Sequence, residues 1–129
     1  ENIDIIRKSL NKKIILIDRF TDSTIAYQHY GMGVNLNLIE TLNKTLLRNI
    51  NVSFTFLNIV NQKNLQKRLK QRKSLNRYDK FEMSFYNKVQ RGFIKLSKKQ
   101  KNKYQLINSN LEIDKNEKLI LSKINKLIK

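Results

Sequence analysis

The 129-residue sequence predicts an α/β fold built around a parallel sheet. Segments with strand character alternate with segments of helical periodicity, which is typical of parallel strands joined by helical crossovers. The first strand, at 14–17, is a run of four apolar residues, three of them β-branched. Such a run is typical of a strand buried on both faces, as in a parallel sheet. No internal repeat and no proline- or glycine-rich linker divides the chain, so we expect one domain.

The elements before residue 34 are a helix, the first strand and a second helix. Apolar residues at helical spacing predict that residues 1–10 form the end of a helix. After the strand at 14–17, a short polar turn leads to a helix start at 22–24, where side-chain oxygens can accept hydrogen bonds from free helix amides. The glycines at positions 31 and 33 interrupt this helix.

A helix and a strand are predicted in the middle of the chain. Leucines recur every four residues between 35 and 48, which predicts an amphipathic helix with Asn35 as its cap. These leucines are Leu38, Leu42 and Leu46. Residues 52–57 are rich in aromatic and β-branched side chains and predict a second strand.

The second half of the chain is predicted to be mostly helical. A basic helix at 62–71 is followed by a polar loop at 73–79 and a long helix at 80–101. We interpret one apolar face of the long helix as core rather than as a cofactor site. That face holds Phe81, Phe85, Val89, Phe93 and Leu96. A third strand at 104–107 and a helix at 115–129 follow. Three strands make a thin sheet, so we expect strands to be missing on the N-terminal side.

The formal net charge is +17, and it is unevenly distributed. Residues 63–103 hold 15 lysines and arginines against two acidic residues, a local excess of 13 positive charges. Such a block raises the hypothesis of a small nucleic-acid-binding module that follows phosphate backbones. The alternative is compositional, because lysine, asparagine and isoleucine dominate the sequence and lysines would cover any solvated face. No RRM, KH or OB signature is legible, so we favour the compositional explanation.

Composition argues against several other classes of protein. The chain has no cysteine, and therefore no disulfide framework, thiolate metal site or thiol nucleophile. We interpret the single histidine, His29, as a loop residue rather than as a metal ligand or a base. No apolar window is long enough for a membrane span, and the charged first ten residues are unlike a signal peptide. We therefore expect a cytoplasmic protein that has no membrane partner.

The first candidate site is the charged pair Asp18-Arg19, which directly follows the strand at 14–17. In open α/β sheets, ligands bind beyond the carboxyl ends of the strands. A carboxylate there can hold Mg²⁺, directly or through water, and a guanidinium can bind phosphate oxygens through two hydrogen bonds. A salt bridge at a strand end is the alternative. We favour phosphate binding, because small polar residues follow the pair directly.

Four polar side chains, Ser23, Thr24, Tyr27 and Gln28, form the second candidate. If a helix starts at residue 22 or 23, Thr24, Tyr27 and Gln28 share one face. A hydroxyl, a phenol and an amide on one face can read a planar base and its sugar, because a glutamine amide both donates and accepts hydrogen bonds. The alternative is an ordinary helix surface. The fixed spacing to the charged pair favours a site.

Three arginines, Arg68, Arg72 and Arg77, form the third candidate. The first two are four residues apart on a predicted helix and so point the same way, and the third follows in the predicted loop. Phosphoryl transfer needs cations around the transferring group, and a lid that closes on the substrate often supplies them. A solvated basic face explains these arginines equally well.

Together these segments resemble the bacterial-type thymidylate kinase family. Asp18-Arg19-Phe20 matches its Asp-Arg-aromatic motif, and Ser-Thr-Ile-Ala-Tyr-Gln at 23–28 matches the Ser-Ser/Thr-x-Ala-Tyr-Gln that follows. Weaker matches continue in the same register over essentially the whole chain. They are Gly31-Met32-Gly33, Leu57-Asn58-Ile59, the arginine-rich segment through Asn76-Arg77-Tyr78-Asp79, residues 85–96, and Ile107-Asn108-Ser109.

The resemblance implies a P-loop nucleotide kinase fold with three layers, α/β/α, and a parallel sheet of which about three strands are present. It implies a dTMP kinase that transfers the γ-phosphoryl group of ATP to dTMP, giving dTDP, with Mg²⁺. Residues 1–129 are then a single incomplete domain, with its acceptor site at about 18–33 and its lid at about 68–79. The family commonly forms homodimers, so we expect the intact protein to do so. Nucleic-acid binding becomes the second-ranked function.

The resemblance also implies residue roles. Arg19 grips the acceptor phosphate, Thr24 and Gln28 read the thymine, and Tyr27 lies against the sugar. The implied catalytic residues are Asp18, Arg19, Arg68, Arg72 and Arg77, and the implied substrate-binding residues are Arg19, Ser23, Thr24, Tyr27 and Gln28. The three lid arginines serve the donor phosphates or the ATP base, and Asp18 holds Mg²⁺, possibly through water.

The sequence departs from the family pattern in two ways. Asparagine stands at positions 58, 76 and 108 where the family tends to have aspartate, and Met32 stands where it has arginine. The Gly-x-x-x-x-Gly-Lys-Ser/Thr loop, whose backbone amides and lysine cradle the ATP phosphates, is absent. We therefore expect a C-terminal portion that cannot phosphorylate a substrate by itself.

Overall fold

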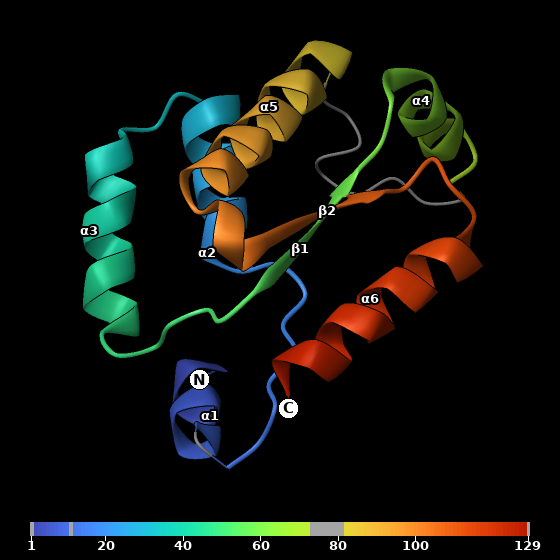
Figure 1. Ribbon diagram of the computed structural model, residues 1–129. Helices are drawn as coiled ribbons and strands as arrows, with labels where there is room; N and C mark the ends of the chain where they lie inside the picture. The colour runs from blue at the N-terminus through green and yellow to red at the C-terminus, as the bar shows by residue number, and fades with distance from the viewer. Residues whose placement is uncertain (1, 11, 73–81, 129) are drawn as a thin grey trace.

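The structure, a computed structural model, describes residues 2–10, 12–72 and 82–128. Figure 1 shows its helices arranged around a small sheet. In chain order, the elements are α1 (Asn2–Ser9), α2 (Thr21–Thr24), the π-helical segment η1 (Ile25–Gly31), α3 (Leu36–Leu47), β1 (Thr55–Ile59), α4 (Gln62–Lys70), α5 (Met83–Lys99), the 3₁₀ turn η3 (Lys101–Lys103), β2 (Tyr104–Asn108) and α6 (Ile113–Leu127).

The sheet consists of β1 and β2, which run parallel, as the sequence predicts. The register pairs Thr55 with Tyr104 and Ile59 with Asn108. The polypeptide between the strands carries α4 and α5, so β2 returns beside β1 through a helical crossover. In Figure 1, α5 and α6 lie on opposite sides of the two strands. This arrangement brings the carboxyl ends of both strands to one edge.

The core lies where η1 packs against α5. Ala26, Phe85 and Val89 form its buried cluster, and Tyr27 and Phe93 pack against it partly buried. This confirms that the aromatic face of the long helix is core.

Two glycines allow this close packing of η1 on α5. A Cβ at Gly31 would lie 2.6 Å from the ring of Phe85, and one at Gly92 would lie 2.5 Å from the ring of Tyr30. Because neither glycine carries a side chain, the two backbones can approach more closely than any other residue type would allow.

The predicted strand at 14–17 is wrong, because these residues form neither strand nor helix. Instead of being buried, Ile14, Leu16 and Ile17 are exposed. A strand requires a neighbouring strand to pair its backbone N–H and C=O groups. Within the described residues, no strand pairs with this segment. The parallel sheet therefore has two strands here, where the sequence predicts about three.

The second strand differs from the prediction in where it begins. It starts three residues later than predicted, at Thr55, where its pairing with β2 begins.

Helix α3 begins after Asn35, whose side chain accepts a hydrogen bond from the amide of Leu38 at 3.2 Å, so the predicted cap is confirmed. Its leucine stripe is nevertheless more than half exposed, and Ile39 is the α3 residue that is buried.

The remaining helices are confirmed, with ends shifted by a few residues. Helices α4, α5 and α6 correspond to the segments predicted at 62–71, 80–101 and 115–129. The predicted loop at 73–79 and Phe81 lie outside the described residues. In the part of the chain that the structure describes, no helix is both long and apolar enough to cross a membrane.

Candidate functional site

Arg19 and Tyr27, two of the predicted acceptor-site residues, lie next to each other. The guanidinium carbon of Arg19 is 5.4 Å from the centroid of the Tyr27 ring, within the range of a cation–π interaction. Arg19 has a φ of 63°, the left-handed region that side-chain-bearing residues rarely adopt. The backbone turn at this residue therefore places an exposed guanidinium over an aromatic face.

The ring of Tyr27 is held in place by contacts with core side chains. Its ring contacts Phe85 and Phe93 edge-on, with centroid separations of 6.0 Å and 6.3 Å. Edge-to-face pairs of this kind add stability beyond the burial of their area. Tyr27 is thus half-buried, and Arg19 lies above a ring that cannot shift without disturbing the core.

The other polar residues of this segment lie on α2 and η1. Thr24 is exposed, whereas Ser23 and Gln28 are half-buried. Because η1 is π-helical, with the amide of Met32 bonded to the carbonyl of Tyr27, its turn is wider than that of an α-helix. The prediction that Thr24, Tyr27 and Gln28 share one face assumes α-helical spacing. In the wider π-helical turn, the angles between these side chains differ from that assumption.

His29 lies in η1 rather than in a loop, so that prediction is wrong. Its Nδ1 donates a hydrogen bond to the carbonyl of Val34 at 2.8 Å. This contact ties the end of η1 to the segment that leads into α3. The ring therefore supports the local turn.

Asp18 is exposed, directly before Arg19. Among the described residues, no group of three or more His, Cys, Asp or Glu side chains could hold a metal ion. Mg²⁺ bound with nucleotides usually takes only one or two carboxylates and completes its shell with phosphates and water. A single exposed carboxylate, such as that of Asp18, matches the protein's share of such a coordination shell.

Asp22 and Tyr104 form a contact that the sequence did not predict. The Tyr104 hydroxyl donates a hydrogen bond to the Asp22 carboxylate. Partial burial raises the pKa of the Tyr104 phenol, and the hydrogen bond and negative charge of Asp22 raise it further. The contact links the start of α2 to the start of β2. The two residues are 82 positions apart, and no local pattern connects them.

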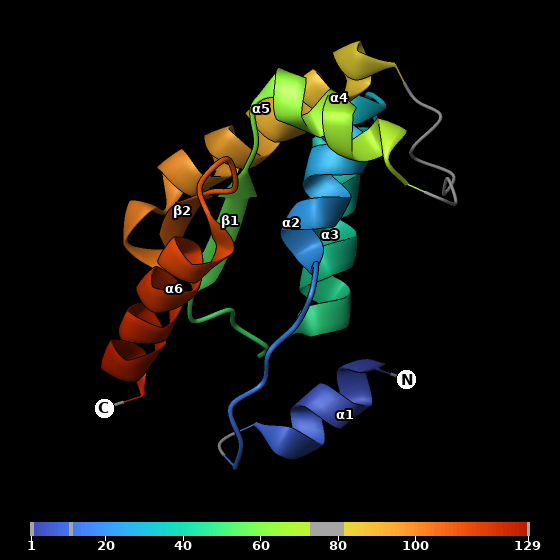
Figure 2. The ribbon, with the colours of Figure 1, turned by 90° about the vertical axis from the view of Figure 1, so that its right-hand side faces the viewer.

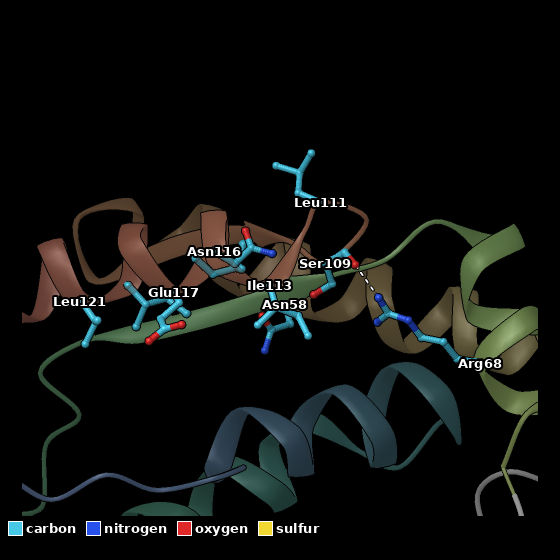
Figure 3. A pocket seen from close by; sticks show the side chains of 10 residues that line it. Asn58, Arg68, Ser109, Leu111, Ile113, Asn116, Glu117 and Leu121 are labelled. Carbon is cyan, nitrogen blue, oxygen red and sulfur yellow. Dashed lines mark hydrogen bonds between the residues drawn. The ribbon is translucent and has the colours of Figure 1, made fainter.

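A second candidate region is an open hollow of about 650 Å³ at the carboxyl ends of β1 and β2. Figure 3 shows Arg68 reaching from α4 toward this edge, where its Nη2 donates a hydrogen bond to the carbonyl of Ser109 at 2.6 Å. Asn58, the last residue but one of β1, and residues of α6 line the same hollow. Of the other lid arginines, Arg72 is exposed just after α4, and Arg77 lies outside the described residues.

Asparagines hold this edge of the sheet together. Asn110 Oδ1 accepts hydrogen bonds from the amide of Asn61 and the side chain of Asn64, both at 3.0 Å. Asn108 Oδ1 accepts from the amide of Asn110 at 3.0 Å, and its backbone carbonyl accepts from the side chain of Asn116 at 3.0 Å. These contacts join the start of α4 to the turn before α6. In the sequence, Asn108 stands out only as a departure from a family motif.

Comparisons with known proteins agree with the motifs. The family model for thymidylate kinase matches residues 2–120. The thymidylate kinase of Ehrlichia canis is 39% identical over 111 residues, which is 84% of this chain and 52% of the relative. The thymidylate kinase of Wolbachia pipientis subsp. Culex pipiens is 33% identical over 105 residues, 81% of this chain and 49% of the relative. This chain therefore spans about half the length of the curated relatives it matches.

The fold agrees as well. The crystal structure of thymidylate kinase from Ehrlichia chaffeensis has a TM-score of 0.66 and 31% sequence identity, and the match covers 97% of this chain and 58% of that one. This likeness confirms the predicted α/β fold of the P-loop kinase class. With the family match over residues 2–120, these findings establish that the chain belongs to the thymidylate kinase family.

Proposed function

We propose that this chain is the C-terminal part of a dTMP kinase and carries its acceptor site and part of its lid. The observation that supports this most directly is the pair formed by Arg19 and Tyr27, with the guanidinium lying over a ring anchored in the core. The pair combines a phosphate-binding cation with an aromatic surface. A nucleoside monophosphate offers the complementary groups, a phosphate and a planar base with its sugar.

The acceptor site is proposed at about residues 18–33. Arg19 binds the acceptor phosphate through two hydrogen bonds, as guanidinium groups commonly do. Thr24 and Gln28 bind the thymine, Ser23 lies beside them, and Tyr27 contacts the sugar. The exposed Thr24 hydroxyl and the half-buried Gln28 amide supply the donors and acceptors that a pyrimidine edge requires.

The donor side is proposed at the hollow, with Arg68 at its rim. ATP is the phosphoryl donor, and Arg68, Arg72 and Arg77 surround its phosphates or its base. Asp18 contributes one carboxylate to a magnesium ion held mainly by the nucleotide, and that ion offsets phosphate charge when it is bound. The protein's own part in such a reaction is to place cations around the transferring group, since little covalent chemistry is required of it.

We propose that residues 1–129 are one incomplete domain and that the chain by itself has no kinase activity. Its sequence contains no Gly-x-x-x-x-Gly-Lys-Ser/Thr loop, because its three glycines, Gly31, Gly33 and Gly92, do not have that spacing. An ADP-release assay with ATP, Mg²⁺ and dTMP should therefore show no turnover above background. Turnover by these 129 residues alone would contradict this part of the proposal.

Binding of dTMP tests the acceptor site independently of turnover. We expect calorimetric titration of the chain with dTMP to show binding that Arg19→Ala weakens by about tenfold to a hundredfold, the usual cost of losing a hydrogen bond to a charged group. Arg91→Ala is the matched control, because Arg91 is an exposed arginine on α5 with no proposed role. An equal loss in both variants would mean that dTMP responds only to the overall positive charge.

A further inference from the structure

The backbone turn at Arg19 has little support from the residues before it. Its φ of 63° lies in the left-handed region, and a residue with a side chain stays there only when its surroundings hold it. Residues 14–18 form neither helix nor strand, and no described residue exchanges a backbone hydrogen bond with them. The nearest support for the turn therefore lies in the residues that follow it.

Helix α2 begins directly after this turn without a side-chain cap. Phe20, at the N-cap position, provides no capping hydrogen bond, and the amide of Ser23 bonds back to the carbonyl of Phe20 at 3.0 Å. Four residues of helix are too few to be stable by themselves. The first turn of α2 therefore depends on contacts with other parts of the molecule.

Tyr104 supplies such a contact from the sheet. Its hydroxyl donates a hydrogen bond to the carboxylate of Asp22, the second residue of α2. Tyr104 is the first residue of β2 and pairs in register with Thr55, whose side chain makes a further hydrogen bond to the same phenol. Figure 2 shows β1 lying between α6 and α2. The phenol thus ties the start of α2 to the sheet.

The contact also engages the Asp22 carboxylate. Burial and the hydrogen bond to Asp22 raise the pKa of Tyr104, so the phenol keeps its proton and remains a donor at neutral pH. No ion pair among the described residues joins Arg19 to Asp18 or Asp22. The guanidinium over the Tyr27 ring is therefore available to an anion.

Two anchors of different kinds hold the residues on either side of Ser23. Tyr27 is anchored by Phe85 and Phe93 in the core, whereas Asp22 is anchored by Tyr104. Arg19 lies three residues before Asp22 and follows a segment without backbone hydrogen bonds to other described residues. Loss of the contact with Tyr104 should therefore loosen the turn at Arg19 and leave the ring of Tyr27 in place.

We propose that Tyr104 is a positioning residue for phosphate binding: its hydrogen bond to Asp22 holds the turn from which the Arg19 guanidinium meets the acceptor phosphate. The proposal rests on the proposed function, because the acceptor phosphate comes from there. Tyr104 acts through Asp22 and is assigned no contact with the substrate. Its effect is therefore expected on binding of the phosphate and not on binding of the base or the sugar.

Nuclear magnetic resonance of the free chain tests the positioning without a ligand. An aromatic ring shifts the resonances of protons that lie over its face, so the Arg19 side-chain signals report whether the guanidinium stays over the Tyr27 ring. In Tyr104→Phe, we expect these signals to move toward the values of an unrestrained arginine, while the ring signals of Tyr27 and Phe85 stay unchanged. Arg19 signals that do not move would overturn the proposal.

Calorimetric titration with dTMP and with thymidine, which lacks the phosphate, tests the consequence for binding. Tyr104→Phe should weaken dTMP binding by about threefold to tenfold, the usual effect of one hydrogen bond, and leave thymidine binding unchanged. A variant that is merely destabilised but still folded by circular dichroism would bind both ligands normally or both more weakly. Either of those patterns would overturn the proposal.

Two substitutions of Asp22 separate positioning from charge. Asp22→Asn keeps an oxygen that accepts the hydrogen bond from the phenol and should retain most of the dTMP affinity. Asp22→Ala removes that oxygen and should match Tyr104→Phe, and the combined variant should show no further loss, because both changes break one contact. Equal losses in Asp22→Asn and Asp22→Ala would assign the effect to charge and overturn the proposal.

The matched control is Tyr86→Phe, which removes the same hydroxyl from another half-buried tyrosine, on α5, with no proposed role in the acceptor site. It should bind dTMP like the unaltered chain, and an equal loss in this control would overturn the proposal. If Tyr104→Phe does not fold, Asp22→Ala breaks the same contact and takes its place.

Arg19→Ala separates the two possible failures. If it weakens dTMP binding whereas Tyr104→Phe and Asp22→Ala do not, the positioning role is wrong and the proposed function stands. If dTMP binds no more tightly than thymidine and Arg19→Ala has no effect, the proposed function is wrong, and the role of Tyr104 in phosphate binding fails with it. Arg19 signals that still move in Tyr104→Phe would then show that the contact holds the turn for another purpose.

Discussion

Two apolar regions of this chain differ in what surrounds them. Between η1 and α5, Ala26, Phe85 and Val89 are no more than 8% exposed, whereas Leu16 is 82% exposed. Both regions are apolar in the sequence. Burial also requires a second surface close enough to exclude water. Helix α5 supplies that surface for η1, whereas Ile14, Leu16 and Ile17 stay exposed and no described strand pairs with their segment.

Truncating one large side chain in each region should give the largest contrast. Phe85→Ala removes a buried ring and should lower the free energy of unfolding by about 3–5 kcal/mol, because the cavity cannot fully close. Leu16→Ala should change it by less than about 0.5 kcal/mol, as is usual for exposed positions. Urea unfolding followed by circular dichroism measures both. Similar losses would show that residues 14–17 are packed in solution.

The glycine contacts sharpen the same comparison. In Gly92→Ala, the new methyl group would lie 2.5 Å from the Tyr30 ring, so we expect a loss of about 1–3 kcal/mol from overpacking. In the combined variant with Tyr30→Ala, the cost of Gly92→Ala should fall but not vanish, because the Cβ of residue 30 would still lie 2.8 Å from the new methyl group.

Gly33→Ala is the control for that experiment. Nothing lies within 4 Å of a Cβ there, but φ is +80°. It should cost about 1–2 kcal/mol through backbone strain alone, and the same amount with or without Tyr30→Ala. A cost of Gly92→Ala that does not depend on Tyr30 would contradict the proposed clash.

The contact between Asp22 and Tyr104 links the start of α2 to the start of β2, and its loss should have a smaller effect than the packing changes at Phe85 and Gly92. Tyr104→Phe removes one hydrogen bond and should cost about 1 kcal/mol in unfolding free energy. Because the pKa of Tyr104 is raised in the folded state, its contribution is fully present below the ordinary tyrosine pKa of about 10 and is lost as pH rises above it. Unfolding free energies of both proteins between pH 7 and 11 should therefore converge at the alkaline end. A constant difference would contradict the assigned cause.

The candidate site was predictable where its residues are close in sequence. The motif containing Asp18, Arg19 and Tyr27 points to one acceptor region, and the structure brings Arg19 and Tyr27 together. The contact between Arg68 and Ser109, 41 positions apart, depends on how α4 and β2 are placed. The π-helical form of η1 could not be predicted either, because its sequence has the same features as an ordinary α-helix.

The sequence by itself determined the helices, the start of α3 at Asn35 and the position of β2, because periodicity and capping act within a few residues. Only the tertiary structure decided that residues 14–17 stay unpaired, that β1 begins at Thr55, and that Ile39 rather than the leucine stripe of α3 is buried. The physical reason is the same in each case. Strand pairing and burial need a second surface, and that surface comes from residues far away in the sequence or from another polypeptide.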